Sequence, residues 1–271
     1  MSLKGKKIAF IGAGNMGEAM IRGLLKAGLS DPADVTASDP RAEHLAALKS
    51  ALGIQSASDS LPAAERADIV VLAVKPQSLP ELLRSLKGRL QAKQLVISIA
   101  AGVRLATIEA DMGALPLIRV MPNTPALVGQ GASAYCLGGS AGEPHARDAE
   151  SLLGCLGLVL RVEESQMDAV TALSGSGPAY VFLFMEALQA AGEKLGLDTE
   201  TSFRLASQTL TGAAAMIAQR ADTPARLREK VTSPGGTTAA ALRAFEEAGL
   251  RELVLKAMTA ARDRGVELGK P

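Results

Sequence analysis

Three glycines near the amino terminus have the spacing of a turn that binds phosphate. The segment reads Gly12-Ala13-Gly14-Asn15-Met16-Gly17, and it joins a short apolar run to an amphipathic stretch of helical period. In such a turn the first glycine permits a tight bend, the second lets the backbone approach a pyrophosphate, and the third lets the helix pack against the strand. The unpaired amides at the helix start hold the phosphates. The sequence therefore predicts a binding site for a nicotinamide dinucleotide here.

The end of the second predicted strand bears on which dinucleotide is bound. It reads Ala37-Ser38-Asp39-Pro40-Arg41. An acidic residue at this position accepts hydrogen bonds from the ribose hydroxyls, so an inward-pointing Asp39 favours NADH. A hydroxyl and an arginine accommodate a 2'-phosphate, so a cradle of Ser38 and Arg41 favours NADPH. Both sets are present, and the sequence leaves NAD (NADH) and NADP (NADPH) open.

Three further segments reach the edge where ligands collect in open parallel sheets. They are Ala73-Val74-Lys75-Pro76, Ser98-Ile99-Ala100-Ala101-Gly102 and Met121-Pro122-Asn123-Thr124-Pro125. Taken singly, Lys75 is equally compatible with an ordinary surface lysine, and the Asn-Thr-Pro string with a simple turn. Their shared position at strand ends predicts that they line the nicotinamide side of the cleft.

Two glycine-containing strings in the carboxy-terminal part have the most specific pattern. They read Ser174-Gly175-Ser176-Gly177-Pro178-Ala179-Tyr180 and Val231-Thr232-Ser233-Pro234-Gly235-Gly236-Thr237-Thr238. In the second string, two glycines leave backbone amides uncovered just before a helix start, a geometry that suits a carboxylate. The alternative is a helix-breaking loop whose threonines are N-caps, and the residue pattern alone favours neither.

Side chains that abstract protons or bind metals do not gather in these motifs. His44 and His145 lie in helical stretches, where we expect an exposed or packed structural role. Cys136 and Cys155 have neither CxxC spacing nor a neighbouring histidine, so we expect small buried hydrophobes. The sequence therefore predicts no metal site and offers no obvious general base.

The elements that position these motifs follow an alternating pattern. Up to about residue 162, short β-branched apolar runs alternate with amphipathic stretches, as in βαβ units. The predicted strands are 8–11, 35–38, 68–74, 95–99, 117–121 and 158–162, with a weaker one near residue 54. After about residue 164 only helices are expected, over 177–196, 198–219, 237–248 and 250–267, with another beginning at Pro224.

This pattern predicts an α/β fold with two domains. Residues 1–164 should form a Rossmann-type, doubly wound and mostly parallel sheet, and residues 165–271 an all-helical domain. The carboxy-terminal part is rich in Ala, Leu, Met and Gly, which favours close helix packing, including packing between subunits.

Composition excludes several classes of partner. The chain has 271 residues, of which 48% are hydrophobic and 21% charged, with a formal net charge of +1. These values indicate a globular protein without the basic excess that nucleic acid or anionic lipid requires. The apolar run after the basic start is too short for a membrane span. We expect a cytoplasmic protein that binds neither nucleic acid nor a membrane.

Together the motifs resemble the pyrroline-5-carboxylate reductase family over essentially the whole chain. The resemblance rests on the glycine-rich turn, 73–76, 121–125, 168–180 and 232–238. It implies reduction of the C=N bond of 1-pyrroline-5-carboxylate to L-proline by hydride from NAD(P)H, the last step of proline biosynthesis. A cyclic imine that arrives protonated needs orientation and a hydrogen-bond partner more than it needs a base, which fits the residues present.

The resemblance also implies roles for individual residues. Thr238, the catalytic residue, would hydrogen-bond the ring nitrogen, and the substrate would also be bound by Ser176, Ser233, Gly235, Gly236 and Thr237. The cofactor would contact the glycine-rich turn together with Ser38, Asp39, Arg41, Ser60, Ala73, Val74, Lys75, Pro76, Ile99, Ala100, Ala101 and Asn123. Ser60 stands where some relatives carry an asparagine near the adenosine end. The all-helical domain would be a dimerisation domain, giving a homodimer and, beyond it, a pentamer of dimers, with Thr238 completing a site on the other subunit.

Two alternative functions come from different classes. One is a reductase of another cyclic imine, or a β-hydroxyacid dehydrogenase of related build. The dehydrogenase needs a lysine on the helix that begins the second domain, and residues 174–180 contain none. The other is a non-catalytic, dinucleotide-binding regulatory protein, which would tolerate damage to the string at 233–238, yet that string is intact.

Overall fold

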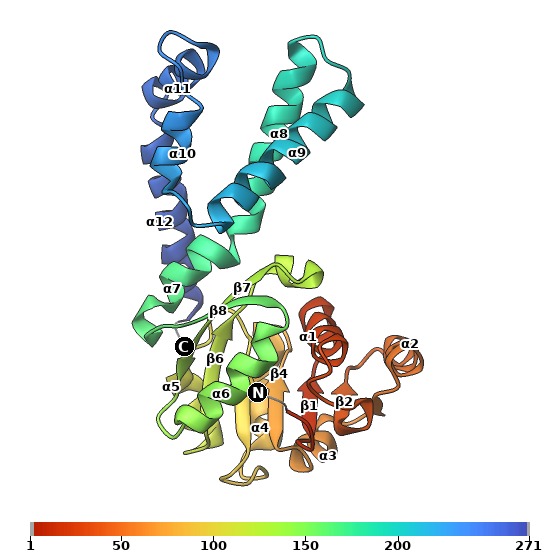
Figure 1. Ribbon diagram of the computed structural model, residues 1–271. Coiled ribbons are helices and arrows are strands. Elements are labelled where there is room, and N and C mark those ends of the chain that lie inside the picture. Colours follow the sequence, from red (N-terminus) through yellow and green to blue (C-terminus); the bar gives the residue numbers. More distant parts are fainter. Residues whose placement is uncertain (1–2, 270–271) are drawn as a thin grey trace. The chain divides into compact units, whose positions relative to one another are not determined.

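One eight-stranded sheet organises the amino-terminal part of the chain (Figure 1). The computed structural model describes residues 3–269. The strand order is β3-β2-β1-β4-β5-β6-β7-β8, and neighbouring strands run parallel except β6 and β7. The strands are β1 (Ile8–Ile11), β2 (Val35–Ser38), β3 (Gln55–Ala57), β4 (Ile69–Leu72), β5 (Leu95–Ser98), β6 (Leu117–Met121), β7 (Gly131–Leu137) and β8 (Gly157–Arg161). The order reverses beside β1, so the predicted doubly wound sheet is confirmed.

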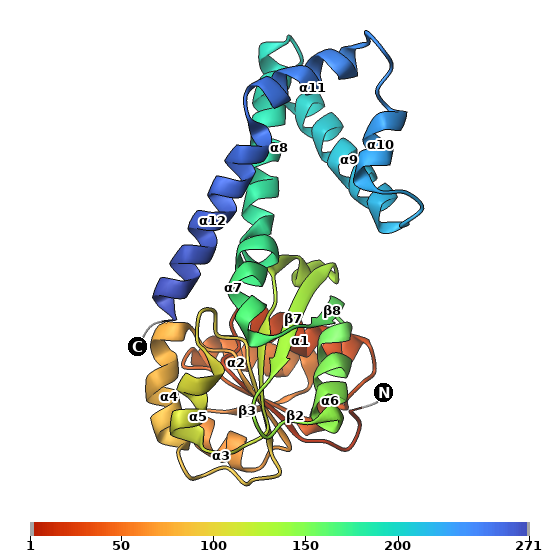
Figure 2. The same ribbon diagram turned by 90° about the vertical axis from the view of Figure 1, so that its left-hand side faces the viewer.

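Helices cover both faces of this sheet (Figure 2). One apolar core lies under α1 (Asn15–Lys26), α2 (Ala42–Leu52) and α6 (Glu143–Gly154). The other lies under α3 (Ser60–Glu65), α4 (Leu79–Leu86) and α5 (Leu105–Met112). Short helical turns connect these elements at η1 (Pro32–Asp34), η2 (Pro76–Ser78) and η3 (Thr124–Val128). Strands β1 and β4 are buried along their whole length, as strands covered on both sides must be.

The prediction is wrong at β7, a strand that the sequence pattern does not indicate. Ala132, Ser133 and Ala134 lack the β-branched side chains that mark the other strands. Pairing holds this segment extended, because β6 lies on one side of it and β8 on the other. Strands β4 and β5 also end earlier than predicted, so Ala73 and Ile99 begin the loops that follow them.

The remainder of the chain is helical, as predicted. It comprises η4 (Glu164–Gln166), α7 (Met167–Val170), the π-helical turn η5 (Thr171–Gly175), α8 (Gly177–Lys194), α9 (Thr199–Ala218), α10 (Pro224–Lys230), α11 (Thr237–Glu247) and α12 (Leu250–Leu268). Two compact units result: residues up to Ser176 with those from Ala261 onward, and Gly177–Ala260. The first unit extends beyond the predicted boundary at residue 164 because Met167 on α7 is buried in its core.

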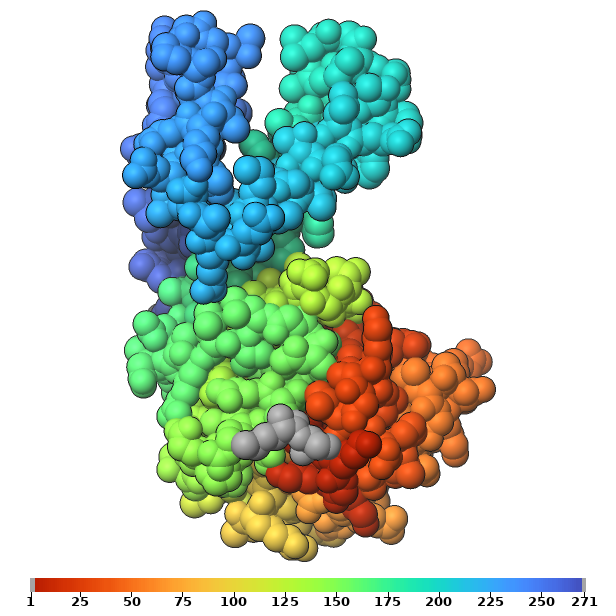
Figure 3. Space-filling view, in the orientation of Figure 1, coloured from red at the N-terminus to blue at the C-terminus, as the bar shows by residue number. Residues whose placement is uncertain are grey.

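The unit formed by Gly177–Ala260 leaves its apolar side chains largely uncovered. Helices α8 and α9 pack as a hairpin, and Figure 3 shows this hairpin and the helices from α10 onward as two lobes with an opening between them. Pro178 and Ser202 are the residues of this unit that are buried. Phe182, Phe203 and Phe245 are all exposed. Exposed apolar side chains in such number are typical of a surface that contacts another molecule.

The described helices include none that is both long and apolar enough to span a lipid bilayer.

A buried arginine ties β6 to the first helical turns after the sheet. The Arg119 side chain is 5% exposed and lies 3.2 Å from Glu164 and 3.9 Å from Asp168. Glu164 also accepts a hydrogen bond from the Leu105 amide at 2.6 Å. Because a buried guanidinium without a carboxylate is strongly unfavourable, this network holds η4 and α7 against the sheet.

We predict that Glu164→Ala destabilises the fold by about 3 kcal/mol, at the lower end for a broken buried pair because Asp168 stays near Arg119. The matched control is Glu143→Ala, which removes the partner of the exposed Arg161 at 2.6 Å and should cost less than about 1 kcal/mol. Urea unfolding followed by circular dichroism measures both. Equal losses would show that the buried network contributes no more than a surface pair.

Candidate active site

The turn between β1 and α1 has the backbone that a dinucleotide requires. Gly12 has φ of +101°, and a Cβ there would lie 2.5 Å from the Ala73 carbonyl oxygen. A Cβ on Gly17 would lie 2.4 Å from the Gly12 carbonyl oxygen. A Cβ on Gly14, in contrast, would meet nothing within 4 Å. Gly12 and Gly17 are therefore required by close packing, whereas Gly14 faces the space where a ligand would approach.

The amides at the start of α1 are available to an anion. The first hydrogen bond within the helix runs from the Glu18 amide to the Gly14 carbonyl at 2.8 Å. Asn15, Met16 and Gly17 thus present amides without an acceptor inside the helix, and no side chain caps this end. Such an uncapped helix start fits the pyrophosphate of a dinucleotide.

Asp39 lies at the end of β2, where it is buried and paired with Arg41. Its carboxylate accepts from the Ala13 amide at 3.0 Å and from the Arg41 side chain at 2.8 and 2.9 Å. The Arg41 amide donates to it as well, at 3.0 Å. The hydrogen bonds from Arg41 lower the pKa of Asp39 from 3.8 to about 2. Asp39 points inward, as the first alternative required, but its oxygens bind the protein's own turn.

His44 also contacts this turn, which sequence reasoning did not foresee. Its Nε2 lies 2.7 Å from the Ala13 carbonyl oxygen and 3.5 Å from Glu18. Ala13 is therefore held through its amide by Asp39 and through its carbonyl by His44 and Arg41. The sequence position of His44 could have indicated this contact, because His44 lies in the first turn of the helix that follows Arg41.

Two serines lie together at the predicted adenosine end of the site. The hydroxyl of Ser38, which is buried, lies 3.1 Å from that of Ser60 at the start of α3. The Gly12 amide donates to the Ser38 carbonyl at 2.7 Å, so β2 and the glycine-rich turn are joined directly. The structure thus brings Ser38, Ser60 and the turn to one edge of the sheet.

The other predicted strand-end residues lie along the same edge. The Ala73 amide donates to Ile11 at 2.8 Å, and the Ile99 amide donates to Leu72 at 3.1 Å, so both residues continue their strands' pairing. Lys75 is exposed, Ala100 is buried and Ala101 is exposed. Val74 and Pro76 are half-buried.

Asn123 differs from these residues because its side-chain amide hydrogen-bonds within the protein through both its oxygen and its nitrogen. Its Nδ2 donates to the Ser174 carbonyl at 3.0 Å, and its Oδ1 accepts from the Ala132 amide at 2.8 Å. The side chain is thus bonded at both ends to other segments of the chain, one of them the turn that precedes Ser176.

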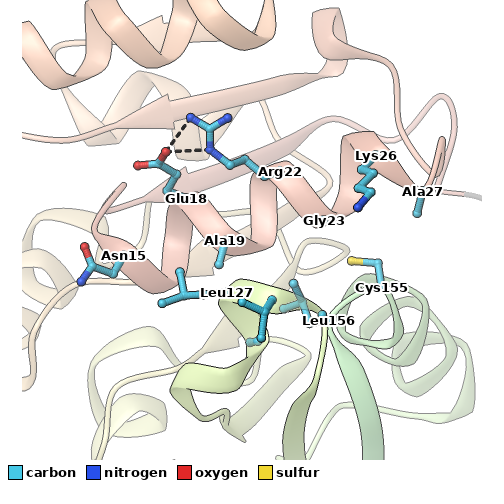
Figure 4. A pocket seen from close by; sticks show the side chains of 13 residues that line it. Asn15, Glu18, Ala19, Arg22, Gly23, Lys26, Ala27, Leu127, Cys155 and Leu156 are labelled. Atoms are coloured by element: carbon cyan, nitrogen blue, oxygen red, sulfur yellow. Dashed lines mark hydrogen bonds and ion pairs between the residues drawn. The ribbon is translucent and has the colours of Figure 1, made fainter. Parts of the chain in front are cut away.

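A separate cavity of about 760 Å³ lies between α1 and the η3 turn (Figure 4). Its lining includes Leu127 and Leu156 on one side and the ion pair of Glu18 and Arg22, 2.7 Å apart, on the other. Of the predicted cofactor residues only Asn15 lines it. The predicted cofactor residues therefore lie, except for Asn15, outside this cavity.

The predicted substrate string lies in the second unit, between α10 and α11. Gly235 has φ of +71°, which favours glycine, and a Cβ on Gly236 would lie 2.4 Å from the Ser233 hydroxyl oxygen, so a side chain there would displace that hydroxyl. The first hydrogen bond within α11 runs from the Ala240 amide to the Gly236 carbonyl at 3.2 Å. The amides of Thr237 and Thr238 thus have no acceptor inside the helix, and no side chain caps it. This geometry suits a carboxylate.

Cysteine and metal chemistry have no centre in the described residues. Burial raises the pKa of both Cys136 and Cys155 to about 11, which keeps the two thiols protonated. Cys136 is buried and Cys155 half-buried. Within residues 3–269, no three His, Cys, Asp or Glu side chains are grouped so that they could hold a metal ion.

Both parts of the chain match known families. Residues 164–268 match the family described as pyrroline-5-carboxylate reductase dimerisation, and residues 7–102 match one described as NADP oxidoreductase, coenzyme F420-dependent. The pyrroline-5-carboxylate reductase of Pseudomonas aeruginosa is 46% identical over 266 residues, which cover 97% of each chain. The chain belongs to the pyrroline-5-carboxylate reductase family. The resemblance read from the motifs is confirmed.

Solved structures of this reductase family have the same fold. The pyrroline-5-carboxylate reductase of Coxiella burnetii has a TM-score of 0.93 at 42% identity, covering 98% of this chain and 99% of the other. The Plasmodium falciparum pyrroline carboxylate reductase, with NADP bound, has a TM-score of 0.88 at 31% identity and the same coverage. The predicted dimerisation domain is confirmed, so the reductase self-associates through its helical region. The roles of individual residues stay predictions.

The Asp39–Arg41 pair predicts a pH-dependent contribution to stability. Because folding lowers the Asp39 pKa from 3.8 to about 2, the charged carboxyl stabilises the fold above pH 3.8, and this contribution is lost as the pH falls towards 2. We expect the free energy of unfolding of wild type to exceed that of Asp39→Asn by about 2 kcal/mol at neutral pH. The difference should shrink below about pH 4. Urea unfolding at a series of pH values measures this difference. A difference that stays constant down to about pH 3 would contradict the assignment.

Proposed function

We propose that this chain reduces 1-pyrroline-5-carboxylate to L-proline, as an oxidoreductase acting on a CH–NH bond. The observation that supports this most is a pair of uncapped helix starts flanked by glycines, at α1 and at α11. The first suits a pyrophosphate and the second a carboxylate. Family membership supports the same reaction, since the relatives carry the name of this enzyme.

The residues of the chain bind and orient the substrate rather than remove a proton from it. The amides around Gly236 and Thr237 hold its carboxylate, with Ser233 and Gly235 shaping the loop, and Ser176 contributes from the neighbouring motif. The Thr238 hydroxyl hydrogen-bonds the ring nitrogen, which stays protonated while the carbon of the C=N bond is reduced. Bound NAD(P)H supplies the hydride. No general base is required for this chemistry.

NADPH is the preferred cofactor in this proposal. All the hydrogen bonds to the Asp39 carboxylate come from Ala13 and Arg41, so it is not free to accept from ribose hydroxyls. The Arg41 side chain is 56% exposed and positively charged at the same strand end. Ser38 and Ser60 add hydroxyls nearby. This set suits a 2'-phosphate better than an unphosphorylated ribose.

The same family membership supports a proposal for the assembly and the location. The dimer is extended into a pentamer of dimers, and Thr238 of one subunit completes the site on its partner's cofactor domain. The uncovered apolar side chains of the helical unit support such contacts. The enzyme works in the cytoplasm, which suits two free, protonated thiols.

We predict oxidation of NADPH that depends on added 1-pyrroline-5-carboxylate. With NADH, kcat/KM should be lower by about tenfold, since a hydrogen bond to a charged group contributes about 1.5 kcal/mol. Steady-state absorbance assays with both cofactors measure this. The six-membered cyclic imine carboxylate serves as the comparison substrate, and higher kcat/KM on it would favour the alternative of another imine reductase. Absence of turnover with either cofactor would favour the non-catalytic alternative.

Thr238→Ala should lower kcat by roughly ten- to a thousandfold, as expected for the loss of one transition-state hydrogen bond. Thr238→Ser retains the hydroxyl and should recover most of this loss. The control is Thr107→Ala, which removes an exposed threonine hydroxyl on α5 and should leave kcat unchanged. Wild-type kcat in Thr238→Ala would remove this residue from the mechanism.

A further inference from the structure

The π-helical turn η5 precedes Ser176 and includes a carbonyl that has no α-helical donor four residues ahead. Its defining bond runs from the Ser176 amide to the Thr171 carbonyl at 2.8 Å. In an α-helix the Ser174 carbonyl would accept from the amide of residue 178, but that residue is a proline and has no N–H. The Ser174 carbonyl therefore has no α-helical donor at position 178, and a half-buried carbonyl is stabilised by a donor from elsewhere.

Asn123 supplies that donor from the end of β6. Its Nδ2 donates to the Ser174 carbonyl at 3.0 Å, while its Oδ1 accepts from the Ala132 amide at the start of β7 at 2.8 Å. Asn123 is 9% exposed. One amide thus joins the loop after β6, the strand β7 and the π-helical turn.

The turn also packs beside this bond against the last residue of β6. A Cβ on Gly175 would lie 2.4 Å from the Met121 side-chain methyl, so the turn lies directly against the last residue of β6. Met121 and Asn123 therefore contact two successive residues of the turn. These contacts lie within one compact unit, since Ser176 is the last residue of its first segment.

We propose that Asn123 is a positioning residue, whose side-chain amide fixes the Ser174–Ser176 segment relative to the strand end on the nicotinamide side. This inference rests on the proposed function, and it replaces direct cofactor binding by the Asn123 side chain. Hydride transfer is sensitive to geometry, because a misplacement of about 1 Å costs about a hundredfold in rate. Losing the Nδ2 donor should therefore slow turnover without weakening the binding of the cofactor.

Asn123→Asp tests this because it changes one atom group and little shape. The ionised carboxylate can still accept from Ala132 but cannot donate to Ser174, and two acceptor oxygens then face each other. We expect kcat at about pH 8.5 to fall by roughly ten- to a hundredfold, while the dissociation constant of NADPH, measured by its fluorescence, changes less than about twofold.

The pH dependence gives a readout that a merely structural role would not move. When the carboxyl group introduced by Asn123→Asp is protonated, its O–H can donate to the Ser174 carbonyl as the amide did. Burial beside a carbonyl favours the protonated form. The ratio of kcat for Asn123→Asp to that for wild type should therefore rise as the pH is lowered from about 8.5 to about 6. Taking the ratio removes the pH dependence of the reaction itself.

Gln94→Glu is the matched control for an amide-to-acid change at a buried bridging side chain. Gln94 is 1% exposed and donates to the carbonyls of Ala64 and Ala67 at 2.8 and 2.5 Å. It precedes β5 and so lies at the amino edge of the sheet, away from the strand ends that carry the site. Gln94→Glu should lower the melting temperature but leave kcat, measured well below that temperature, equal to wild type.

Several outcomes would overturn the proposal while wild type remains active. The first is an unchanged kcat in Asn123→Asp. The second is a weakening of NADPH binding by the same factor as the fall in kcat. The third is a ratio of variant kcat to wild-type kcat that does not vary with pH. If Asn123→Asp does not fold, Asn123→Ser replaces it and should show the same fall in kcat with unchanged NADPH affinity. Failure of the proposed function is distinguishable, since wild type itself would then not turn over the imine.

Discussion

The close approach of two backbones at the carboxyl edge of the sheet is the constraint on which the cofactor half of the site depends. Gly12 has only a hydrogen where a Cβ would lie 2.5 Å from the Ala73 carbonyl oxygen. The turn after β1 can therefore lie against the end of β4, where the Ala73 amide already bonds Ile11. This contact directs the chain straight into α1, so that the first amides of the helix face outward at the strand ends. A side chain at position 12 would displace the turn and those amides together.

Hydrogen bonds to Ala13 and Arg41 give Asp39 a structural role, although its charge alone could repel the ligand. A bare carboxylate at the end of β2 would oppose the negative charge of a phosphorylated dinucleotide. Arg41 neutralises Asp39, and the pair fastens Ala13 in the middle of the turn. The low pKa of Asp39 reflects this use, because the charged form is the one that makes these bonds. The same residue is thus buried, ionised and structural.

The sequence predicts the elements better than the partners of individual side chains. Periodicity and β-branched runs locate β1, β2 and β6 at their observed bounds, because those strands are buried on both faces. They miss β7, whose alanines and serine carry no such signal and whose conformation comes from pairing on both sides. Ser38, Asp39 and Arg41 are correctly placed at one strand end, yet the sequence treats Asp39 and Arg41 as alternatives when they form one ion pair.

Asn123 illustrates the same limit, since position predicts its neighbourhood but not what its amide bonds. Its two partners lie nine residues ahead at Ala132 and 51 residues ahead at Ser174, and no local pattern encodes either contact. Pro178 has no N–H to offer the Ser174 carbonyl. Only the fold shows which side chain provides the replacement.

The substrate half of the site has a different basis, because its supporting unit has almost no core of its own. Pro178 and Ser202 are the buried residues among Gly177–Ala260, and α10 and α11 contain none. Helices without a buried face are marginal in water, so the conformation of the loop between α10 and α11 depends on surfaces that cover them. Self-association of the family provides those surfaces. The amides at the start of α1 are held by the sheet, whereas those at the start of α11 lie in a unit with almost no core of its own.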